Sequence, residues 1–521
     1  MNDRRDEHPL PVGGAVLRVW RTIIGDVSNI FIIIGATTLA VLLLMNQPLH
    51  PQPWFDEGLN AGAAAMIARA GVYALPDADS PRISDPAIQT GPIVLIPIAL
   101  VYKLLTPSIA LARLVIVPFA LIAFVTFAVL ARRLTGPWSA ILATVCMMAG
   151  AGGIFNSFVP MGRMVLGEVA ALAYLLLGLL IWIRALRLPS GQQAWTYWLF
   201  SGLAWGLAMT TKSQVLILVP VALATLFVLD RIYYRQLKPA AIIVSGSAAV
   251  GCAAAWYGAQ FVIAGDRAPA NLNVLREGFQ LHIAAFEPHY WRNALGVLWR
   301  SAWWLWGAPA LLWGLRQAWQ RTEHGLTHAS VLIFPSLSLL WFTVFSIGWE
   351  RYAFYFTTLS FLWLGGILSD GWQHLRRSIG ARRWFLGLYI AMVTGLFVWN
   401  GLTMIAHIVQ PKESGYAAMV QFLQRHISPE AIIATWEWEI AVEAHHRLRH
   451  PQTSVTNAAT RFIMSRRRPP DDLYDAFQTN PEYILVGAFA DWVGVYHEEL
   501  RSERVQKIAE NGIYRLYRVI P

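Results

Sequence analysis

Long apolar segments recur along most of this chain, and they constrain its fold more than any other feature. They begin near Ile23 and end near His407, and a helix needs about 20 apolar residues to cross a bilayer. Charged residues make up only 14% of the chain, whereas soluble domains average about 25%. The sequence therefore predicts a polytopic α-helical membrane protein that lies in a lipid bilayer.

The composition changes at the stretch HIVQPKESGY, residues 407–416. Residues 411–521 have ordinary polarity and contain no spanning segment, and they alternate between helix and strand patterns. We therefore predict two domains, a transmembrane domain over 1–410 and a soluble C-terminal α/β domain over 411–521. The net charge of the whole chain is +10. The excess of positive charge lies in the membrane part, because residues 411–521 are slightly negative, and cytoplasmic loops account for it. Nucleic acid is therefore not an expected partner.

The C-terminal domain has its own pattern of elements. Helical periodicity marks residues 415–427 and 436–448, and strand patterns mark residues 431–435, 482–489 and 513–520. These segments predict a small sandwich-like domain with a partly parallel sheet. We expect this domain to shape access to a site in the membrane part rather than to carry chemistry of its own.

Basic clusters indicate which ends of the spans face the cytoplasm. Lys and Arg are enriched on that side, and the N-terminal tail is basic. The later clusters are Arg132/Arg133, Arg184/Arg187, Arg231/Arg235/Lys238, Arg316/Arg321 and Arg376/Arg377/Arg382/Arg383. All of these clusters face the cytoplasm if the apolar run 91–105 does not cross the membrane. This run is short, has Pro97 in its middle and carries Lys103. A run of this length is more often re-entrant or interfacial.

The remaining runs give about 11 spans, with 91–105 as a short helix at the outer face. The expected spans are 23–45, 108–131, 138–155, 165–184, 195–211, 214–230, 238–264, 293–315, 329–347, 353–369 and 384–408. The C-terminal domain then lies outside, in the periplasm or the extracellular space.

Charged residues from several distant segments share the outer face in this topology. They are the acids Asp56, Glu57, Glu168 and Glu350 and the bases Arg163, Lys212 and Arg351. Ionisable residues at the ends of spans are usually functional or paired. A carboxylate can act as a general base, and Arg or Lys can hold a phosphate. Together these groups suit a reaction that deprotonates a hydroxyl and stabilises an anionic leaving group.

Each of these residues also has a structural explanation. Asp56 is a candidate N-cap for a helix that begins at DEGLNAG, because Asp favours that position. Glu57 can then face elsewhere, since neighbouring helical residues point ~100° apart. The corresponding explanations are an ion pair of Glu168 with Arg163, a snorkelling side chain for Lys212 and an ion pair of Arg351 with Glu350.

Six motifs follow one another in the membrane part. They are the pair Asp56-Glu57, the short apolar helix TGPIVLIPIALVYKLL, a span that opens with Arg113 and closes with ARRLTG, the corner GRMVLGE, the segment GLAMTTK that ends at Lys212, and the pair Arg351-Tyr352. Their order resembles that of the GT-C class of membrane glycosyltransferases, which includes protein O-mannosyltransferases and the aminoarabinose transferases of lipid A. The resemblance covers about residues 20–400. It departs at Thr90-Gly91-Pro92, where many relatives have His- or Lys-Pro-Pro.

The resemblance implies that residues 1–410 form a GT-C-like catalytic domain. Its reaction would be an inverting sugar transfer from a polyprenyl-monophosphate donor to a hydroxyl of a glycolipid, glycan or protein, at the outer face of the cytoplasmic (inner) membrane. Asp56 would be the general base, with Glu57 or Glu168 supporting it, and the helix 91–105 would roof the site. The donor phosphate would be held by Arg163, Lys212, Arg351 and Tyr352. No metal-ligating set is recognised and no cofactor is implied with certainty, although a divalent cation is left open.

Three other functions remain open at this stage. A transporter or flippase of a lipid-linked sugar is one, although we see no internal repeat of the kind common in transporters. A glycan ligase or polymerase that uses a diphosphate-linked lipid is another, because the loop 265–292 contains several Arg and His residues. The third is a scaffold for a cell-surface complex, which explains the soluble domain but not the opposed acids and bases.

Overall fold

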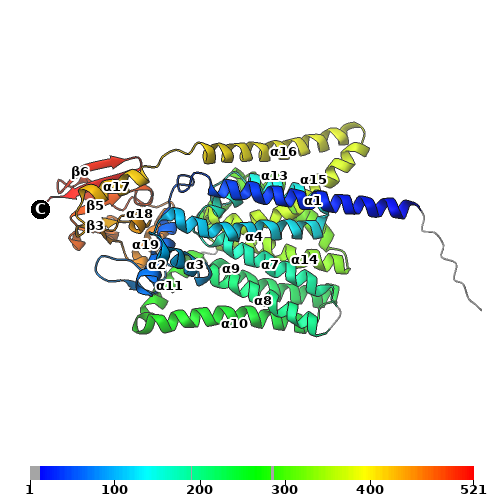
Figure 1. The fold of residues 1–521 in the computed structure, drawn as a ribbon, viewed down its shortest axis with the longest axis horizontal. Helices are drawn as coiled ribbons and strands as arrows, with labels where there is room; N and C mark the ends of the chain where they lie inside the picture. The colour runs from blue at the N-terminus through cyan, green and yellow to red at the C-terminus, as the bar shows by residue number, and fades with distance from the viewer. Residues whose placement is uncertain (1–11, 189–190, 283–286, 521) are drawn as a thin grey trace, which may run out of the picture.

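The computed structural model describes residues 12–188, 191–282 and 287–520 of the chain (Figure 1). Most of the membrane part consists of helices that run side by side along the long axis. These helices are α1 (Val12–Leu44), α4 (Ile109–Thr135), α5 (Pro137–Ala149), α7 (Glu168–Leu186), α8 (Gln192–Thr211), α9 (Ser213–Leu229), α10 (Pro239–Ala264), α13 (Trp303–Ala318), α14 (Glu323–Leu340), α15 (Phe354–Arg377) and α16 (Gly380–Val409). They form a bundle, with the C-terminal sheet at one of its ends, which we call the sheet-side end.

Shorter elements occur between the long helices along the chain. They are α2 (Phe55–Ala70), β1 (Ala74–Leu75), β2 (Arg82–Ile83), α3 (Pro92–Leu104), α6 (Phe158–Gly162), α11 (Ala268–His282) and α12 (Pro288–Arg300). The predicted short helix over 91–105 corresponds to α3, which lies beside α2 near the sheet-side end of the bundle in Figure 1.

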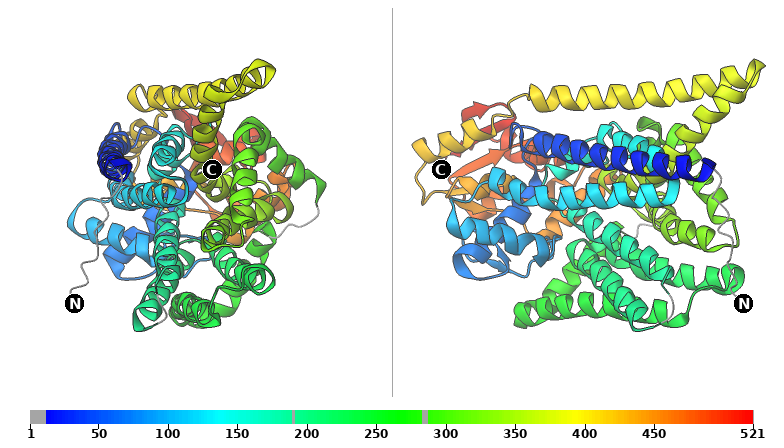
Figure 2. Two further views of the ribbon diagram at one scale, coloured as in Figure 1. Left: turned by 90° about the vertical axis from the view of Figure 1, so that its right-hand side faces the viewer. Right: turned by 45° about the vertical axis from the view of Figure 1, so that its right-hand side comes forward.

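Eight helices in the described part are long and apolar enough to cross a membrane. Each coincides with one of the predicted spans. The other three predicted spans fall on α5, α8 and the pair α12–α13, so the total number of spans stays a prediction. Helix α16 lies at the edge of the bundle in both views of Figure 2, and only 11% of its apolar window is buried by protein. Its exposed face is therefore available to lipid.

Two predicted spans differ from the observed helices for local reasons. The span predicted over 293–315 is broken between α12 and α13, where Ala302 has a left-handed φ of 48°. Helix α12 is amphipathic, with Trp291, Leu295 and Trp299 exposed along one side, as in helices that lie in a membrane interface. The span predicted over 138–155 ends early because Gly150 has φ of 80°.

The basic clusters gather at the end of the bundle opposite the sheet. Arg132 donates to Asn29 Oδ1 on α1 at 2.7 Å, and Arg187 lies 3.8 Å from Glu323 at the start of α14. Helices α4, α7 and α15 each begin at the sheet-side end and finish near these clusters. Segments far apart in the sequence thus place their basic residues on a common face, as a membrane protein with one cytoplasmic side requires.

The C-terminal segment contains a five-stranded mixed sheet with the order β4-β3-β5-β7-β6. Its elements are α17 (Tyr416–His426), β3 (Ile432–Thr435), α18 (Trp438–Glu443), β4 (Arg447–Arg449), α19 (Thr453–Met464), β5 (Tyr483–Val486), α20 (Ala488–Val493), α21 (His497–Arg501), β6 (Val505–Asn511) and β7 (Tyr514–Val519). Strand β3 is parallel to β4 and β5, whereas β7 is antiparallel to β5 and β6. The predicted helix over 436–448 is shorter than expected, because β4 takes its last residues.

Two buried acids fix α18 to the sheet. Glu437 accepts hydrogen bonds from the backbone N–H groups of Gly487, Phe489 and Ala490, and Glu439 accepts one from the Tyr514 hydroxyl at 2.9 Å. Burial, together with the Glu437 carboxylate beside it, raises the pKa of Glu439 well above its ordinary value. These hydrogen bonds hold the start of α18 against β7 and against the segment that follows β5.

Helix α18 in turn packs directly on α2, the helix that carries the Asp-Glu pair. A Cβ atom on Gly58 would lie 2.1 Å from the backbone nitrogen of Glu439 and 2.1 Å from the carbonyl carbon of Trp438. The rings of Phe55 on α2 and Phe489 on α20 stack with their centroids 3.8 Å apart. The C-terminal segment and α2 thus share one apolar core, while the domain boundary at residue 411 stays a prediction.

Gly58→Val is expected to separate α2 from α18 and to lower the melting temperature. Two backbones meet at Gly58, so the added methyl groups have no side chain to push aside, and overpacking costs about 1–3 kcal/mol. Limited proteolysis should then cut the C-terminal segment faster. Gly62→Ala is the matched control on the same helix, because its Cβ would lie 3.3 Å from the side chain of Pro76. Equal melting temperatures for wild type and Gly58→Val would contradict the close contact.

Candidate active site

Asp56 lies in the first turn of α2 and faces a basic residue from the far side of the sequence. Its Oδ2 atom accepts a hydrogen bond from Arg351 Nη1 at 2.7 Å and one from Trp54 Nε1 at 3.2 Å. The N-cap of α2 is Trp54, and no side chain caps this helix. The capping explanation for Asp56 is therefore not realised, and neither is the pairing of Arg351 with Glu350.

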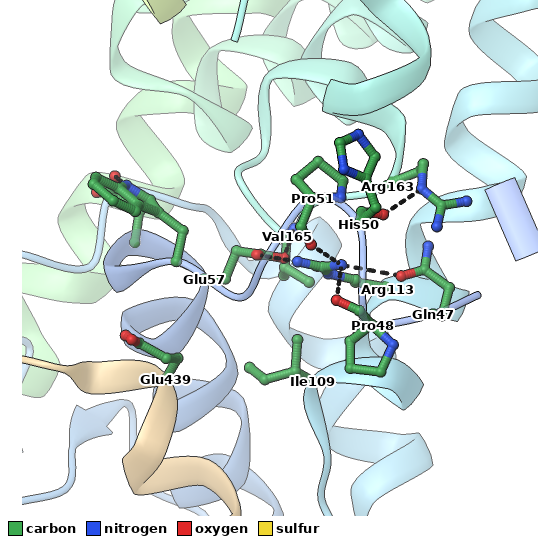
Figure 3. A network of polar contacts seen from close by, with 12 residues as sticks. Gln47, Pro48, His50, Pro51, Glu57, Ile109, Arg113, Arg163, Val165 and Glu439 are labelled. Atoms are coloured by element: carbon green, nitrogen blue, oxygen red, sulfur yellow. Dashed lines mark hydrogen bonds and ion pairs between the residues drawn. The ribbon is translucent and has the colours of Figure 1, made fainter. Parts of the chain in front are cut away.

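Glu57 contacts a different basic residue from Asp56: it makes a buried ion pair with Arg113 on α4 (Figure 3). The two side chains are fully buried and meet through two hydrogen bonds, of 2.9 Å and 2.6 Å. Glu57 also accepts from the backbone N–H of Val165 at 2.9 Å. Such a bidentate pair fixes geometry, so Glu57 ties α2 to α4 and to the corner before α7.

Arg113 also holds the loop that leads into α2. Its Nη1 group donates to Gln47 Oε1 and to the carbonyl oxygens of Pro48 and Pro51, at 2.8–3.1 Å. Arg113 entered the sequence analysis only as part of a motif, without a role. The structure makes it the centre of the network in Figure 3.

Arg163 is placed differently from the sequence expectation. Its guanidinium donates to the carbonyl oxygens of Leu42, Met45, Asn46 and His50 and is fully buried. The Leu42 carbonyl lies in the last turn of α1, where a helix has no further N–H donors of its own, and Met45 and Asn46 follow directly after that helix. Arg163 therefore closes the end of α1, and it is not among the residues that line the cavity described below. It is also not paired with Glu168.

Glu168 and Lys212 form a second buried pair behind Asp56 and Arg351. Lys212 Nζ lies 3.0 Å from Glu168 Oε1 and donates to the Leu166 carbonyl at 3.0 Å. Because Lys212 is buried and paired, the snorkelling explanation does not apply. Lys212 interacts electrostatically with both Asp56 and Arg351, so the two pairs form one charged cluster.

Backbone contacts explain why Thr90-Gly91-Pro92 stands where many GT-C enzymes have His- or Lys-Pro-Pro. Thr90 pairs with Lys212 in an antiparallel bridge, and a Cβ on Gly91 would lie 1.7 Å from the Thr210 carbonyl oxygen. Only glycine allows this approach of two backbones. The segment before α3 is thus held against the α8–α9 corner and fixes the backbone on either side of Lys212.

A cavity of 290 Å³ opens beside Asp56 at the sheet-side end. Of the predicted site residues, Asp56, Arg351 and Tyr352 line it, whereas Glu57, Arg163, Glu168 and Lys212 do not. Residues 84–91 form one wall, so the segment before α3 covers the site rather than α3 itself. Other walls come from α10, α11, α19 and residues 347–352.

Trp349 is a further lining residue that the sequence analysis did not single out. The Arg351 guanidinium carbon lies 4.2 Å from the Trp349 ring centroid, within the range of a cation–π contact. This contact and the Asp56 carboxylate hold the guanidinium on two sides. Arg351 Nε is buried and has no hydrogen-bond partner among the described residues.

Within the described part of the chain, no group of three or more His, Cys, Asp or Glu side chains is placed to hold a metal ion. The acids of the site each have a basic partner instead: Asp56 has Arg351, Glu57 has Arg113 and Glu168 has Lys212. The arrangement can take a proton at Asp56 and hold an anion at Arg351.

Comparison with known proteins gives a match to one family model over part of the chain. Residues 89–256 match the family model described as dolichyl-phosphate-mannose-protein mannosyltransferase. The match covers less than half of the chain, and it includes neither Asp56 nor Arg351. A comparison with curated protein sequences gave no match.

Solved structures extend the similarity to the whole fold. ArnT from Cupriavidus metallidurans bound to undecaprenyl phosphate superposes with a TM-score of 0.59 at 13% identity, over 96% of this chain and 97% of that chain. The archaeal oligosaccharyltransferase AglB from Archaeoglobus fulgidus, in complex with an inhibitory peptide and a dolichol-phosphate, gives 0.57 at 12% identity, over 94% and 74%. Both are GT-C glycosyltransferases. This chain therefore has the GT-C fold of a multi-pass membrane protein, and the expected resemblance is confirmed.

Proposed function

We propose that this chain is an inverting glycosyltransferase that moves a sugar from a polyprenyl monophosphate to an acceptor hydroxyl. The observation that carries the proposal is the pair of Asp56 and Arg351 on the wall of the cavity, 2.7 Å apart. The family match and the undecaprenyl phosphate bound to ArnT support the donor class. We place the site at the outer face of the cytoplasmic membrane, with the C-terminal segment outside, because the basic clusters lie at the opposite end of the bundle.

In the proposed reaction, Asp56 removes the proton from the acceptor hydroxyl as its oxygen attacks the anomeric carbon of the sugar. The bond from that carbon to the phosphate oxygen breaks, and polyprenyl phosphate leaves as the anion. Attack from the side opposite the phosphate inverts the anomeric configuration. The fixed charge of Arg351 meets the leaving phosphate, and preorganised charge of this kind is a major source of rate enhancement. Lys212 adds a second positive charge behind it, and Glu168 holds Lys212 in place.

A second, mostly apolar cavity is the proposed binding site for the polyprenyl chain of the donor. It has a volume of 160 Å³ and lies between α9, α14 and α15. Ser213 and Leu216 of α9 line the first cavity, while Gln214 and Ile217 line the second, so the two cavities lie on neighbouring sides of one helix turn. A polyprenyl chain in the second cavity would bring its phosphate towards Arg351 and Tyr352.

Arg351→Gln is expected to lower kcat by about 10²–10³-fold. The glutamine removes the charge that meets the leaving phosphate, yet it can still donate a hydrogen bond to Asp56. Arg351→Lys should recover part of the loss, because it restores the charge without the guanidinium fork. Initial rates of polyprenyl phosphate release from a labelled donor measure both effects. An Arg351→Gln protein with wild-type kcat would remove Arg351 from the proposed mechanism.

The proposed function is tested in cells by removing the gene. Mass spectrometry of envelope glycolipids, glycans and glycoproteins should find one class without a sugar that the parent strain carries, and lipid extracts should contain more of a polyprenyl-phosphate sugar. A wild-type copy should restore the modification, whereas an Asp56→Asn copy should not. Transport of a lipid-linked sugar by the purified protein, without any transfer, would favour the transporter or flippase instead. Use of a diphosphate-linked donor would favour the ligase or polymerase.

A further inference from the structure

We infer that the part of the 290 Å³ cavity next to the C-terminal segment is a binding site for a neutral sugar, and that the acceptor hydroxyl belongs to a glycan. This inference rests on the proposed function, which leaves the acceptor open. It starts from helix α19, where Thr453, Thr456, Asn457 and Thr460 line the cavity. Their spacing places them along one face of the helix, and all of them carry uncharged hydrogen-bonding groups.

The amide groups around the cavity have capacity for a ligand. The side chains of Asn457 and Gln89 make no hydrogen bond to another side chain or to the backbone in the part of the chain that the structure describes. Gln260 donates only to the Tyr73 hydroxyl, at 3.3 Å. An amide side chain offers two donors and one acceptor with two lone pairs. Neighbouring hydroxyls of a sugar ring, each a donor and an acceptor, match such groups.

Aromatic side chains complete the site. Trp256 and Tyr73 meet edge to face, with ring centroids 5.5 Å apart, and both line the cavity. Aromatic faces pack against the C–H surface of a sugar ring, because that surface is apolar. Trp438 also borders the cavity, but its ring lies between His450, at 3.6 Å, and the Arg82 guanidinium, at 5.0 Å. Trp256 is therefore the better platform.

The few charged residues on the cavity wall favour a neutral sugar over other classes of acceptor. Apart from Asp56 and Arg351, which serve the reaction, Asp85 is the one charged residue among the described residues of the wall. A phosphorylated acceptor would find no further cation on the wall itself, because Lys212 lies behind it and Arg82 is already paired with Asp77 and Asp85. An extended peptide gains much of its affinity by pairing with the edge of a sheet, and no residue of the five-stranded sheet lines the cavity. A neutral glycan meets neither obstacle.

Binding of simple glycosides to the full-length protein in detergent tests this inference without any need for transfer. The probes are methyl glycosides of neutral hexoses and pentoses and their short oligosaccharides, followed by saturation-transfer NMR and tryptophan fluorescence. A Ser/Thr-containing peptide and a sugar phosphate serve as comparators. We expect at least one neutral glycoside to bind. Asn457→Leu and the nearly isosteric Thr456→Val should each weaken it about tenfold, the effect of losing one or two hydrogen bonds.

Ser454→Ala is the matched control, because Ser454 lies on α19 but not on the cavity wall, and it should bind as the wild type does. The inference is overturned if no neutral glycoside binds, if the peptide or the sugar phosphate binds more tightly, or if both α19 variants bind normally. Failure of the proposed function looks different: the glycoside would bind in an Asn457-dependent way while no donor is consumed. A donor that is consumed without any glycoside binding would overturn the glycan site alone.

Discussion

Asp56→Asn should abolish sugar transfer while leaving the protein folded. Asparagine keeps the size of the side chain and can still accept the hydrogen bond from Arg351 Nη1, but it cannot take a proton from the acceptor. General-base catalysis contributes about 10²–10⁴-fold to a rate, so turnover should fall by at least that range. The effect belongs to kcat, since the cavity that holds donor and acceptor keeps its shape.

The matched control is Asp85→Asn, which changes the other carboxylate on the cavity wall. Asp85 accepts from the Thr453 hydroxyl at 2.6 Å and from the backbone N–H of Ala87 at 2.8 Å, so its role is to hold the wall. Asp85→Asn should retain most of kcat. Melting temperatures of all proteins are compared with that of the wild type. Purified Asp56→Asn that turns over as the wild type does would remove Asp56 from the role of base.

The second large effect is expected on stability, from the buried pair of Glu57 and Arg113. Arg113→Met leaves the Glu57 carboxylate buried without its cation, and breaking a buried pair from one side costs about 3–5 kcal/mol. The same change frees the loop carbonyls of Pro48 and Pro51, which Arg113 holds. We therefore expect a marked drop in melting temperature and poor expression.

The double variant Glu57→Gln/Arg113→Met separates charge from packing. It removes the uncompensated charge and keeps an acceptor for the Val165 N–H, so it should melt at a higher temperature than Arg113→Met alone. Arg501→Met is the surface control, because Arg501 and Glu498 form an exposed pair at 3.9 Å and such pairs contribute about 0–1 kcal/mol. If the double variant melts no higher than Arg113→Met, the charge of Glu57 is not what makes the single change costly.

Asp56 and Glu57 contact different basic residues, and this difference shows how much of the site the sequence could predict. Adjacent helical residues diverge by ~100°, so one acid acting while its neighbour supports it was a reasonable expectation. Helical spacing could not predict which basic residues these two acids contact. Arg113 and Arg351 lie 56 and 295 positions from the acids that they contact, and a single sequence carries no signal for pairs so far apart.

The role expected for Arg163 shows a different limit. The topology correctly brought Arg163 to the same end of the bundle as Asp56, but it gave no account of the backbone. The carbonyls of Leu42 and Met45 at the end of α1 need donors, and Arg163 supplies them. A basic residue near a phosphate site and a basic residue that closes a helix look alike in a sequence.

The contribution of α19 to the cavity also lay beyond sequence reasoning. No helix was predicted over 453–464, although α19 is amphipathic and carries polar residues on the side that lines the cavity. Its place in the site depends on how α18 meets α2 at Gly58, which is a tertiary contact. The overall class, by contrast, follows from long apolar segments and basic clusters, since both are set by the bilayer itself.

The central claim is that the cavity beside Asp56 transfers a sugar from a polyprenyl monophosphate. The most direct test incubates the purified protein with a donor labelled in the sugar and an extract of envelope acceptors, and follows polyprenyl phosphate and label together. We expect one polyprenyl phosphate for each sugar that moves to the acceptor, with inverted anomeric configuration, and no turnover with Asp56→Asn. Retention of configuration, or turnover that does not depend on Asp56, would contradict the account.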